Sequence, residues 1–334
     1  MAVSIKDIAR IAGVSHSTVS RALRGSELIP PHTRERIQRI AAEQGYSASA
    51  IARSLVTQRT NAIGIVVTSI ADPFNGEVVD GLEQTANAAG YSVVLATSQA
   101  DPKREISIVQ TLRERRVDGI IIASSRVGAL YAEDLAPLEV PIVLLNNQHA
   151  GGFGNSIGID NVDGAEQATE YLLKLGHRKI AYIRDRSGMQ SDEERCQGYQ
   201  NALRRHGVRI RKQLIASGDG KPQAGRRAAA ELLSRAERVT AVFSYNDMTA
   251  LGVLEEASAR HLRVPEDLSV CGFDDIFFAR FLHPPLTTVR QPKHELGERA
   301  MKLLLEVLSG QHTNKVVKVR GELVIRQSTA PPTA

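Results

Sequence analysis

The chain has 334 residues, of which 42% are hydrophobic and 24% are charged, and its formal net charge is +5 at pH 7. It contains no apolar run near the ~18 residues of a membrane span, no secretory signal in MAVSIKDIAR, and only two cysteines, Cys196 and Cys271, without metal-ligand spacing. These features argue against membrane proteins and disulfide-rich secreted proteins, and they predict a cytoplasmic protein of two or three domains without metal or cofactor.

The excess positive charge is confined to the N-terminal end. The first 60 residues hold nine Lys/Arg and four Asp/Glu, whereas the remaining 274 residues hold 33 of each. A cationic end on an otherwise neutral chain is expected of a segment that neutralises DNA phosphates. A solvated basic face is the alternative, but it would not require the rest of the chain to be balanced.

Residues 9–23, ARIAGVSHSTVSRAL, predict the end of one short helix, a tight turn and a second short helix. Gly13 can take a positive φ in the turn, Ser15 can cap the second helix, and Val19 faces the first helix. An ordinary helical hairpin has the same local pattern, but a helix-turn-helix would place the second helix in a DNA major groove. The candidate DNA-contacting residues of this segment are His16, Ser17, Thr18, Ser20, Arg21 and Arg24.

A third helix is expected over 32–44, after Pro30-Pro31 and before Gly45, so that residues 1–46 form a small helical DNA-binding domain. The following segment, within 47–60, favours a helix but is too short to be stable alone, and we expect it to fold as a hinge against a partner. Ala52 would let two copies pack closely, and Leu55 would protrude as an apolar wedge. A flexible linker is the alternative.

From residue 61 the pattern changes to alternating strands and helices, which predicts an α/β core of two doubly wound parallel sheets. The alternation ends in an extended segment at 287–291, a helix at 293–308 and an extended segment at 315–326, so the chain should cross between two lobes more than once. We expect one lobe at about 61–159 plus 291–320, the other at about 160–290 plus 321–330, and a cleft between them. The expected strands are 62–68, 92–97, 119–123, 142–145, 156–159, 179–183, 213–216, 241–244 and 269–273, and the expected helices are 74–89, 104–115, 130–135, 162–175, 192–206, 224–235 and 247–259.

Over its whole length the chain resembles the lac repressor family of bacterial transcription regulators, whose core is similar to periplasmic binding proteins. The motifs that carry the resemblance are IKDIARIAGVSHSTVSRAL, ARSL, DPFN, VDGIII, GHRKIAYI, YNDMTALG, GFDD, PPLTTVRQP and LVIRQST, and the N-terminal region is most similar to the purine repressors. The resemblance implies a homodimer on a near-palindromic double-stranded operator, and because no heptad helix follows the last family motif we expect a dimer and not a tetramer. It implies that His16, Ser17 and Arg21 read bases, that Thr18 and Ser20 contact phosphates, and that Ala52 and Leu55 enter the minor groove.

The resemblance also implies a site for a small carbohydrate-like effector, in which Phe74 offers an aromatic face and Arg195 clamps a hydroxyl or carboxylate. Asn246 and Asp274 would bind hydroxyls, although both could simply cap helices. Two departures bear on the ligand: Gly220 stands where some relatives have a stacking tryptophan, and Arg184-Asp185-Arg186 replaces a usual glycine-proline. The two arginines could favour an anionic ligand or lie on the surface. By position, the implied effector-binding residues are Asp72, Phe74, Asn75, Asn146, Arg195, Asn246, Asp274 and Gln291.

Three other functions fit the sequence less well. A periplasmic solute receptor would need an export signal and no basic N-terminal segment. An enzyme on a doubly wound sheet would need a motif such as G-x-G-x-x-G, a P-loop, HExxH or GxSxG, none of which is present in the sequence. A constitutive DNA-bending protein would have no use for the cleft. We therefore expect a ligand-responsive transcriptional regulator, most simply a repressor.

Overall fold

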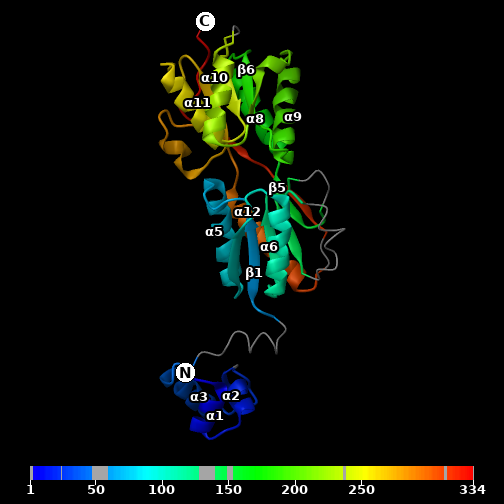
Figure 1. Ribbon diagram of the computed structural model, residues 1–334, viewed down its shortest axis with the longest axis vertical. Helices are drawn as coiled ribbons and strands as arrows, with labels where there is room; N and C mark the ends of the chain where they lie inside the picture. The colour runs from blue at the N-terminus through cyan, green and yellow to red at the C-terminus, as the bar shows by residue number, and fades with distance from the viewer. Residues whose placement is uncertain are drawn as a thin grey trace. The chain divides into compact units, whose positions relative to one another are not determined.

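The computed structural model describes residues 3–23, 25–46, 59–127, 140–148, 153–235, 238–311 and 314–333. The chain divides into two compact units, Met1–Thr60 and Asn61–Ala334 (Figure 1). The predicted hinge helix with Ala52 and Leu55, the helix end at Arg24 and the segment predicted at 130–135 lie outside the described residues. None of the described helices is long and apolar enough to span a membrane.

The first unit contains three helices, α1 (Ile5–Ala12), α2 (His16–Leu23) and α3 (Pro31–Glu43). Their core includes Ile8, Val19 and Ile37, which are fully buried. The turn between α1 and α2 has the predicted form: Gly13 adopts φ 62°, and Oγ of Ser15 accepts a hydrogen bond from the backbone N–H of Thr18 at 3.1 Å. The helix-turn-helix prediction is confirmed.

The first sheet of the second unit consists of parallel strands in the order β11-β5-β4-β3-β1-β2. Helices α5 (Pro73–Ala88) and α12 (Lys293–Leu308) contribute to the hydrophobic core on one face of this sheet, and α6 (Pro102–Glu114) contributes to the core on the other. The strands are β1 (Ala62–Val67), β2 (Ser92–Thr97), β3 (Gly119–Ala123), β4 (Ile142–Leu145), β5 (Ser156–Ile159) and β11 (Val316–Val319).

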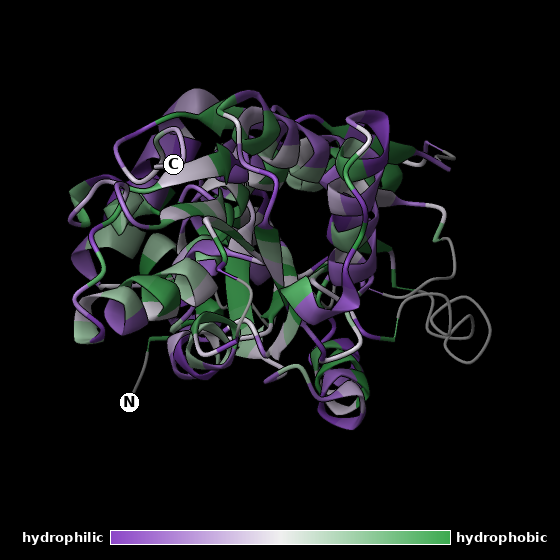
Figure 2. Ribbon diagram, turned by 90° about the horizontal axis from the view of Figure 1, so that it is seen from above, coloured by the Kyte–Doolittle hydropathy of each residue, from purple (hydrophilic) through white to green (hydrophobic). Residues whose placement is uncertain are grey.

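The second sheet has the order β12-β10-β9-β8-β6-β7 and is parallel except for β12. Helices α8 (Asn161–Lys174) and α9 (Gln190–Arg205) pack on one face, and α10 (Pro222–Leu233) and α11 (Asp247–Ala259) pack on the other. Figure 2 shows hydrophobic colour on the central strands and mixed colour on the covering helices. The strands are β6 (Ile180–Asp185), β7 (Ile215–Gly218), β8 (Ala241–Ser244), β9 (Ser269–Asp274), β10 (Thr287–Arg290) and β12 (Glu322–Val324), and short 3-10 helices lie at Lys212–Leu214 and Phe277–Phe281.

The chain crosses between the two sheets after β5, after β10 and after β11. The carboxyl ends of the strands in the two sheets therefore face each other, which is where ligands bind in doubly wound folds. The predicted two-lobed α/β fold is confirmed. The extended tail predicted at 315–326 contains two strands that belong to different sheets, as the predicted crossing between the lobes requires.

Most element boundaries differ from the prediction by two residues or fewer. Helices α5, α6 and α10 begin at Pro73, Pro102 and Pro222, because proline is well suited to the first helical turn. Strand β6 continues two residues further than predicted, to Asp185, so this carboxylate lies at the sheet edge that faces the other lobe.

Candidate functional site

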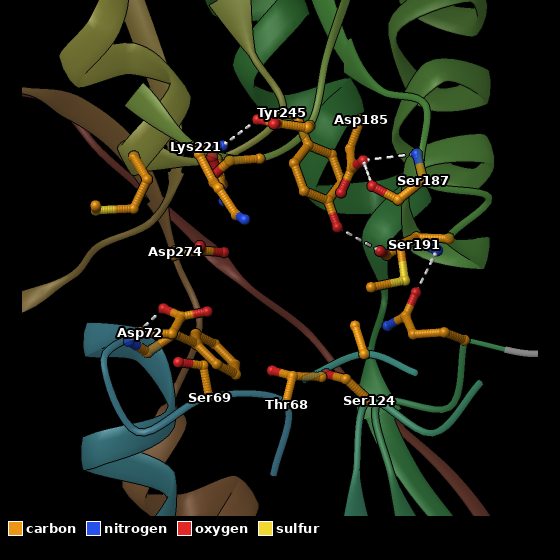
Figure 3. Close-up of a pocket in the computed structure, with 18 of the residues that line it drawn as sticks. Thr68, Ser69, Asp72, Ser124, Asp185, Ser187, Ser191, Lys221, Tyr245 and Asp274 are labelled. Atoms are coloured by element: carbon orange, nitrogen blue, oxygen red, sulfur yellow. Dashed lines mark hydrogen bonds between the residues drawn. The ribbon is translucent and has the colours of Figure 1, made fainter. Parts of the chain in front are cut away.

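A cavity of about 870 Å³ lies between the two lobes at the facing carboxyl ends of the sheets (Figure 3). Its size is within the range of small-molecule sites, and its wall combines aromatic rings with a few convergent polar groups. The first lobe contributes the residues around Asp72, and the second lobe contributes those around Tyr245 and Asp185. The lining includes seven of the eight predicted effector residues: Asp72, Phe74, Asn146, Arg195, Asn246, Asp274 and Gln291.

On the first-lobe side, the cavity wall is built around the start of α5. The carboxylate of Asp72 caps this helix by accepting a hydrogen bond from the backbone N–H of Phe74 at 3.0 Å, and burial raises the pKa of Asp72. The structure does not place Asn75 on the cavity wall. Asn75 is only 2% exposed. Its side chain donates to the backbone oxygen of Ser69 at 2.7 Å and to the hydroxyl of Thr68 at 3.2 Å, so it stabilises the β1–α5 loop.

Asn146 directly follows β4 with φ 49°, and its Oδ1 accepts a hydrogen bond from the backbone N–H of Ile159 at 3.1 Å. Next to it, Gln148 reaches the other lobe: its Oε1 accepts from the backbone N–H of Ser191 at 3.0 Å, and its Nε2 donates to the oxygen of Asn146 at 2.8 Å. Arg126 also connects the lobes, through a hydrogen bond to the backbone oxygen of Ser187. These contacts hold the lobes together across the cavity.

Arg195 is 5% exposed and is held by several groups of the second lobe. Its Nε donates to Oδ1 of Asn161 at 2.9 Å, and its Nη1 donates to the backbone oxygen of Tyr245 at 2.6 Å. Its guanidinium lies 3.7 Å from the centroid of the Phe273 ring, a cation–π geometry. Nη2 has no hydrogen-bond partner among the described residues, which leaves this nitrogen to donate to a ligand.

Asp274 and Gln291 form the acceptor-rich part of the wall. Nε2 of Gln291 donates to Oδ1 of Asp274 at 2.7 Å, while the buried Oε1 of Gln291 has no hydrogen-bond partner in the described part of the chain. Burial raises the pKa of Asp274 to about 6, although the Arg195 guanidinium acts in the opposite direction. Two carboxylates, Asp72 and Asp274, and the free amide oxygen together favour a ligand that donates several hydrogen bonds, such as a polyol.

The helix-capping alternative holds for only one of the two residues considered. Asn246 caps α11, since its Oδ1 accepts from the backbone N–H of Thr249 at 2.8 Å, and it lines the cavity as well. Asp274 does not cap the following 3-10 helix, whose N-cap residue is Ile276.

The two arginines that suggested an anionic ligand do not line the cavity. Arg184 pairs with Asp192, through Nε at 2.7 Å, and with Glu193, while Arg186 is exposed. Of the two alternatives, a surface position holds for Arg186, and neither arginine supports an anionic ligand in the cavity. Arg126, which does line the cavity, was missed because a single arginine after an apolar strand is not a distinctive signal.

In the first unit, α2 presents the predicted reading residues. His16, Ser17 and Arg21 are exposed, whereas Thr18 and Ser20 are half-buried. The hydroxyl of Thr18 lies 2.8 Å from that of Ser15 within the helix cap. The exposed side of α2 is therefore polar and basic, as a major groove requires.

Two family models match the chain: "Bacterial regulatory proteins, lacI family" over residues 4–49 and "Periplasmic binding protein-like domain" over residues 169–329. Similar proteins include the HTH-type transcriptional repressor CytR of Escherichia coli K12, 36% identical over 98% of this chain and 96% of the relative. The ribose operon repressor of Haemophilus influenzae is 35% identical over 97% of this chain and 98% of the relative.

Solved structures of related regulators are also similar to this chain over nearly its whole length. The lac repressor dimer bound to operator and the anti-inducer ONPF has a TM-score of 0.90 and 28% identity, and the match covers 99% of this chain and 100% of that one. A complex of the transcriptional regulator CelR with cellobiose has a TM-score of 0.75 and 32% identity, and the match covers 98% and 99% of the two chains.

Proposed function

We propose that this chain, which belongs to the lacI family of bacterial regulatory proteins, represses transcription under the control of a small carbohydrate-like effector that binds between its lobes. It acts as a homodimer on a near-palindromic operator. The observation that carries the proposal is the combination of an exposed polar recognition helix in one unit with a polar interlobe cavity of about 870 Å³ in the other.

In this proposal the chain has three functional parts. Residues 1–46 bind DNA, residues 47–60 form the hinge, and residues 61–334 bind the effector and dimerise. The lobes of the last part comprise about 61–159 with 291–320 and about 160–290 with 321–330. The protein acts in the cytoplasm, where the operator is, and the relatives named above are repressors and regulators and not enzymes.

The DNA-binding role is assigned to α2, Arg24 and the hinge. His16, Ser17 and Arg21 face outward and would read base edges, and an arginine that binds a guanine in a bidentate manner contributes about 1–3 kcal/mol of discrimination. Thr18 and Ser20 would contact phosphates. In the hinge, Ala52 and Leu55 would enter the minor groove, where Leu55 would kink the duplex.

The effector role is assigned to the cavity wall. Asp72, Asp274 and Gln291 supply acceptors, Arg195 and Asn246 supply donors, and Phe74 supplies a ring against which a sugar can pack. Asn146 and Asn75 support the wall. The relatives whose names include ribose and cellobiose favour a carbohydrate-like ligand for this site.

Coupling between the two roles follows from linkage. An effector that favours one arrangement of the lobes changes operator affinity by the same factor by which the operator changes effector affinity. A coupling free energy of about 1–3 kcal/mol is typical of such systems. The experiment that tests the proposal is a thermal-shift screen of sugars, sugar acids and purines, followed by operator-binding titrations with each hit. The proposal is wrong if no hit changes operator affinity.

A further inference from the structure

We infer that the cavity contains a second subsite, formed by Asp185, Gly220 and Tyr245, which receives a second ring of the effector through a hydroxyl or amino donor on that ring. The inference rests on the proposed function of the cavity as the effector site. It narrows the effector to an uncharged two-ring molecule, such as a disaccharide or a nucleoside, in place of a single sugar or its phosphate ester.

The first observation is a buried carboxylate with one unused oxygen. Asp185 is 5% exposed and lines the cavity at the end of β6. Its Oδ1 accepts hydrogen bonds from the backbone N–H of Ser187, at 2.8 Å, and from the Ser187 hydroxyl. Its Oδ2 accepts no hydrogen bond from any residue that the structure describes. Figure 3 shows Asp185 beside Tyr245 and Ser187 on the second-lobe side of the cavity.

Neighbouring groups hold Asp185 in place without neutralising it. The backbone N–H of Asp185 donates to Oδ1 of Asp192 at 3.0 Å, and Asp192 also accepts from Nε of Arg184 at 2.7 Å and from the hydroxyl of Tyr182 at 3.1 Å. Within the described part of the chain, Arg184 forms ion pairs with Asp192 and Glu193. Arg184 is therefore committed to other carboxylates, Arg186 is exposed, and the Asp185 carboxylate remains available to a ligand.

The second observation is the space in front of that oxygen. Gly220 has φ +75°, and a Cβ atom there would lie 3.3 Å from Oδ2 of Asp185, 3.5 Å from Nδ2 of Asn246 and 3.6 Å from Cε1 of Tyr245. A Cβ at position 220 would thus already be in contact with all three groups. The missing side chain therefore leaves room between the carboxylate and the tyrosine ring.

The third observation is that the subsite is lined by a fixed aromatic side chain. The hydroxyl of Tyr245 lies 2.8 Å from Oγ of Ser191, and the Arg195 guanidinium lies 4.6 Å from the Tyr245 ring centroid. The edge of the ring that carries Cε1 faces the space next to Gly220. A cavity of about 870 Å³ is in the upper part of the 300–1,000 Å³ that ligand sites occupy, so it has room for more than one ring.

The charges around the cavity disfavour an anionic group at this position. Two of the three cationic side chains in the lining form internal hydrogen bonds: Arg195 with Asn161 and Tyr245, and Arg126 with the backbone oxygens of Ala100 and Ser187. The third, Lys221, is exposed. The four carboxylates of the lining are Asp72, Asp185, Asp219 and Asp274. A phosphate beside Asp185 would add repulsion, whereas a hydroxyl or amino group would donate to Oδ2.

The test is calorimetric titration of the full-length protein with matched probes: D-ribose against the two pyrimidine ribonucleosides and their 5′-monophosphates, and D-glucose against cellobiose. We expect one or more uncharged two-ring probes to bind about tenfold or more tightly than the matched single ring, and nucleoside monophosphates to bind more weakly than nucleosides. Asp185→Asn should lower the affinity for the preferred two-ring probe by roughly ten- to a hundredfold, the range expected for a charge-assisted hydrogen bond. It should leave the affinity for the single ring unchanged.

Two control variants separate the subsite from general effects. Glu193→Gln removes a carboxylate that pairs with Arg184 and does not line the cavity, and the variant should bind all probes as the wild type does. Gly220→Ala should lower the affinity for the two-ring probe more than the affinity for the single-ring probe. Gly207→Ala carries the same backbone cost, since its φ is +67° with nothing within 4 Å of the added Cβ, and it should leave both affinities unchanged.

The outcomes distinguish the subsite from the site as a whole. If single-ring and two-ring probes bind equally well, or if Asp185→Asn changes neither, the subsite is refuted and the effector site stands. If monophosphates bind best and Lys221→Ala removes that preference, the subsite receives an anion and the inference is wrong. If no probe binds, both the subsite and the carbohydrate-like effector are refuted.

Discussion

Nη1 of Arg195 lies 3.7 Å from Oδ1 of Asp274, and both side chains are buried in the wall of the interlobe cavity. The same Asp274 oxygen accepts from Gln291, so Asp274 is held from two sides while it remains part of the cavity lining. This pair supplies an acceptor and a donor at the place where the two lobes meet.

The first prediction concerns Asp274. Asp274→Asn should weaken effector binding about tenfold or more, because the charge-assisted hydrogen bond to a ligand hydroxyl is lost. The control is Asp275→Asn, since Asp275 pairs with Arg290 and Arg326 and does not line the cavity. Titration calorimetry with a hit from the thermal-shift screen measures both. Equal losses in the two variants would contradict the assignment.

The second prediction concerns stability and pH. Asp247 is fully buried, and burial, with a smaller effect of the Asp274 charge, raises its pKa to about 8. For an acid whose pKa is raised on folding, the folded state binds the proton more tightly. The stabilising contribution is therefore complete below the unfolded pKa, near 3.8, and is lost as the pH rises through about 8.

Asp247→Asn should remove this pH dependence. As the pH increases from 5 to 8, the wild type loses unfolding free energy and the variant does not. The melting temperature of the variant relative to the wild type should therefore rise by roughly 2–4 °C for each kcal/mol that the wild type loses. An amide can still accept from the backbone N–H of Ile276, which donates to Asp247 at 2.9 Å. Thermal melts at several pH values check the prediction, and a constant difference between variant and wild type would refute it.

The third prediction concerns the contact between the lobes at Gln148. Gln148→Ala removes the acceptor of the Ser191 N–H, so the closed arrangement should lose about 0.5–1.5 kcal/mol and effector affinity should fall several-fold. Gln84→Ala is the matched control, because Gln84 is exposed and its amide bonds Asp80 and His294, which both belong to helices of the first lobe. Small-angle X-ray scattering should show a larger radius of gyration for Gln148→Ala and an unchanged one for Gln84→Ala. An unchanged radius and affinity would mean that this contact does not hold the lobes together.

The fourth prediction separates base reading from phosphate binding. Arg21→Ala should relax the preference for one base pair by about 1–3 kcal/mol. Arg34→Ala, on α3, should weaken binding to all duplexes alike. It should also reduce the slope of the logarithm of the affinity against the logarithm of the salt concentration by about one. Fluorescence anisotropy with operator variants at several salt concentrations measures both effects. If the two variants behave identically, α2 is not the recognition helix.

The sequence predicted the fold closely because the signals were local. Apolar runs such as 119–123 and 142–145 gave the exact strand bounds, and Gly13 and Ser15 predicted the turn. The cavity was less predictable, since it depends on which side chain of a segment faces inward. In Arg184-Asp185-Arg186 the sequence pointed to the two arginines as possible ligand-binding residues, but Asp185 is the residue that lines the cavity. The alternation of strand side chains decides this, and the predicted end of β6 was two residues short.

Asn75 illustrates a second limit. A short polar side chain after DPF matches a ligand-binding position in sequence, but its direction in the first turn of α5 carries it to the β1–α5 loop, where it bonds Ser69 and Thr68. Helical geometry places residues i and i+1 on different faces, so Asn75 is turned away from the cavity that the preceding Phe74 lines.

The central claim is that a DNA-reading unit is controlled by a ligand cavity in the same chain. The most direct measurement selects duplexes from a random pool with the purified protein and then titrates the selected duplex with and without effector hits. We expect a twofold-symmetric sequence, bound about a thousandfold or more tightly than bulk DNA, whose affinity changes at least fivefold with a cavity ligand. Enrichment of no symmetric sequence, or an affinity that no ligand changes, would contradict it.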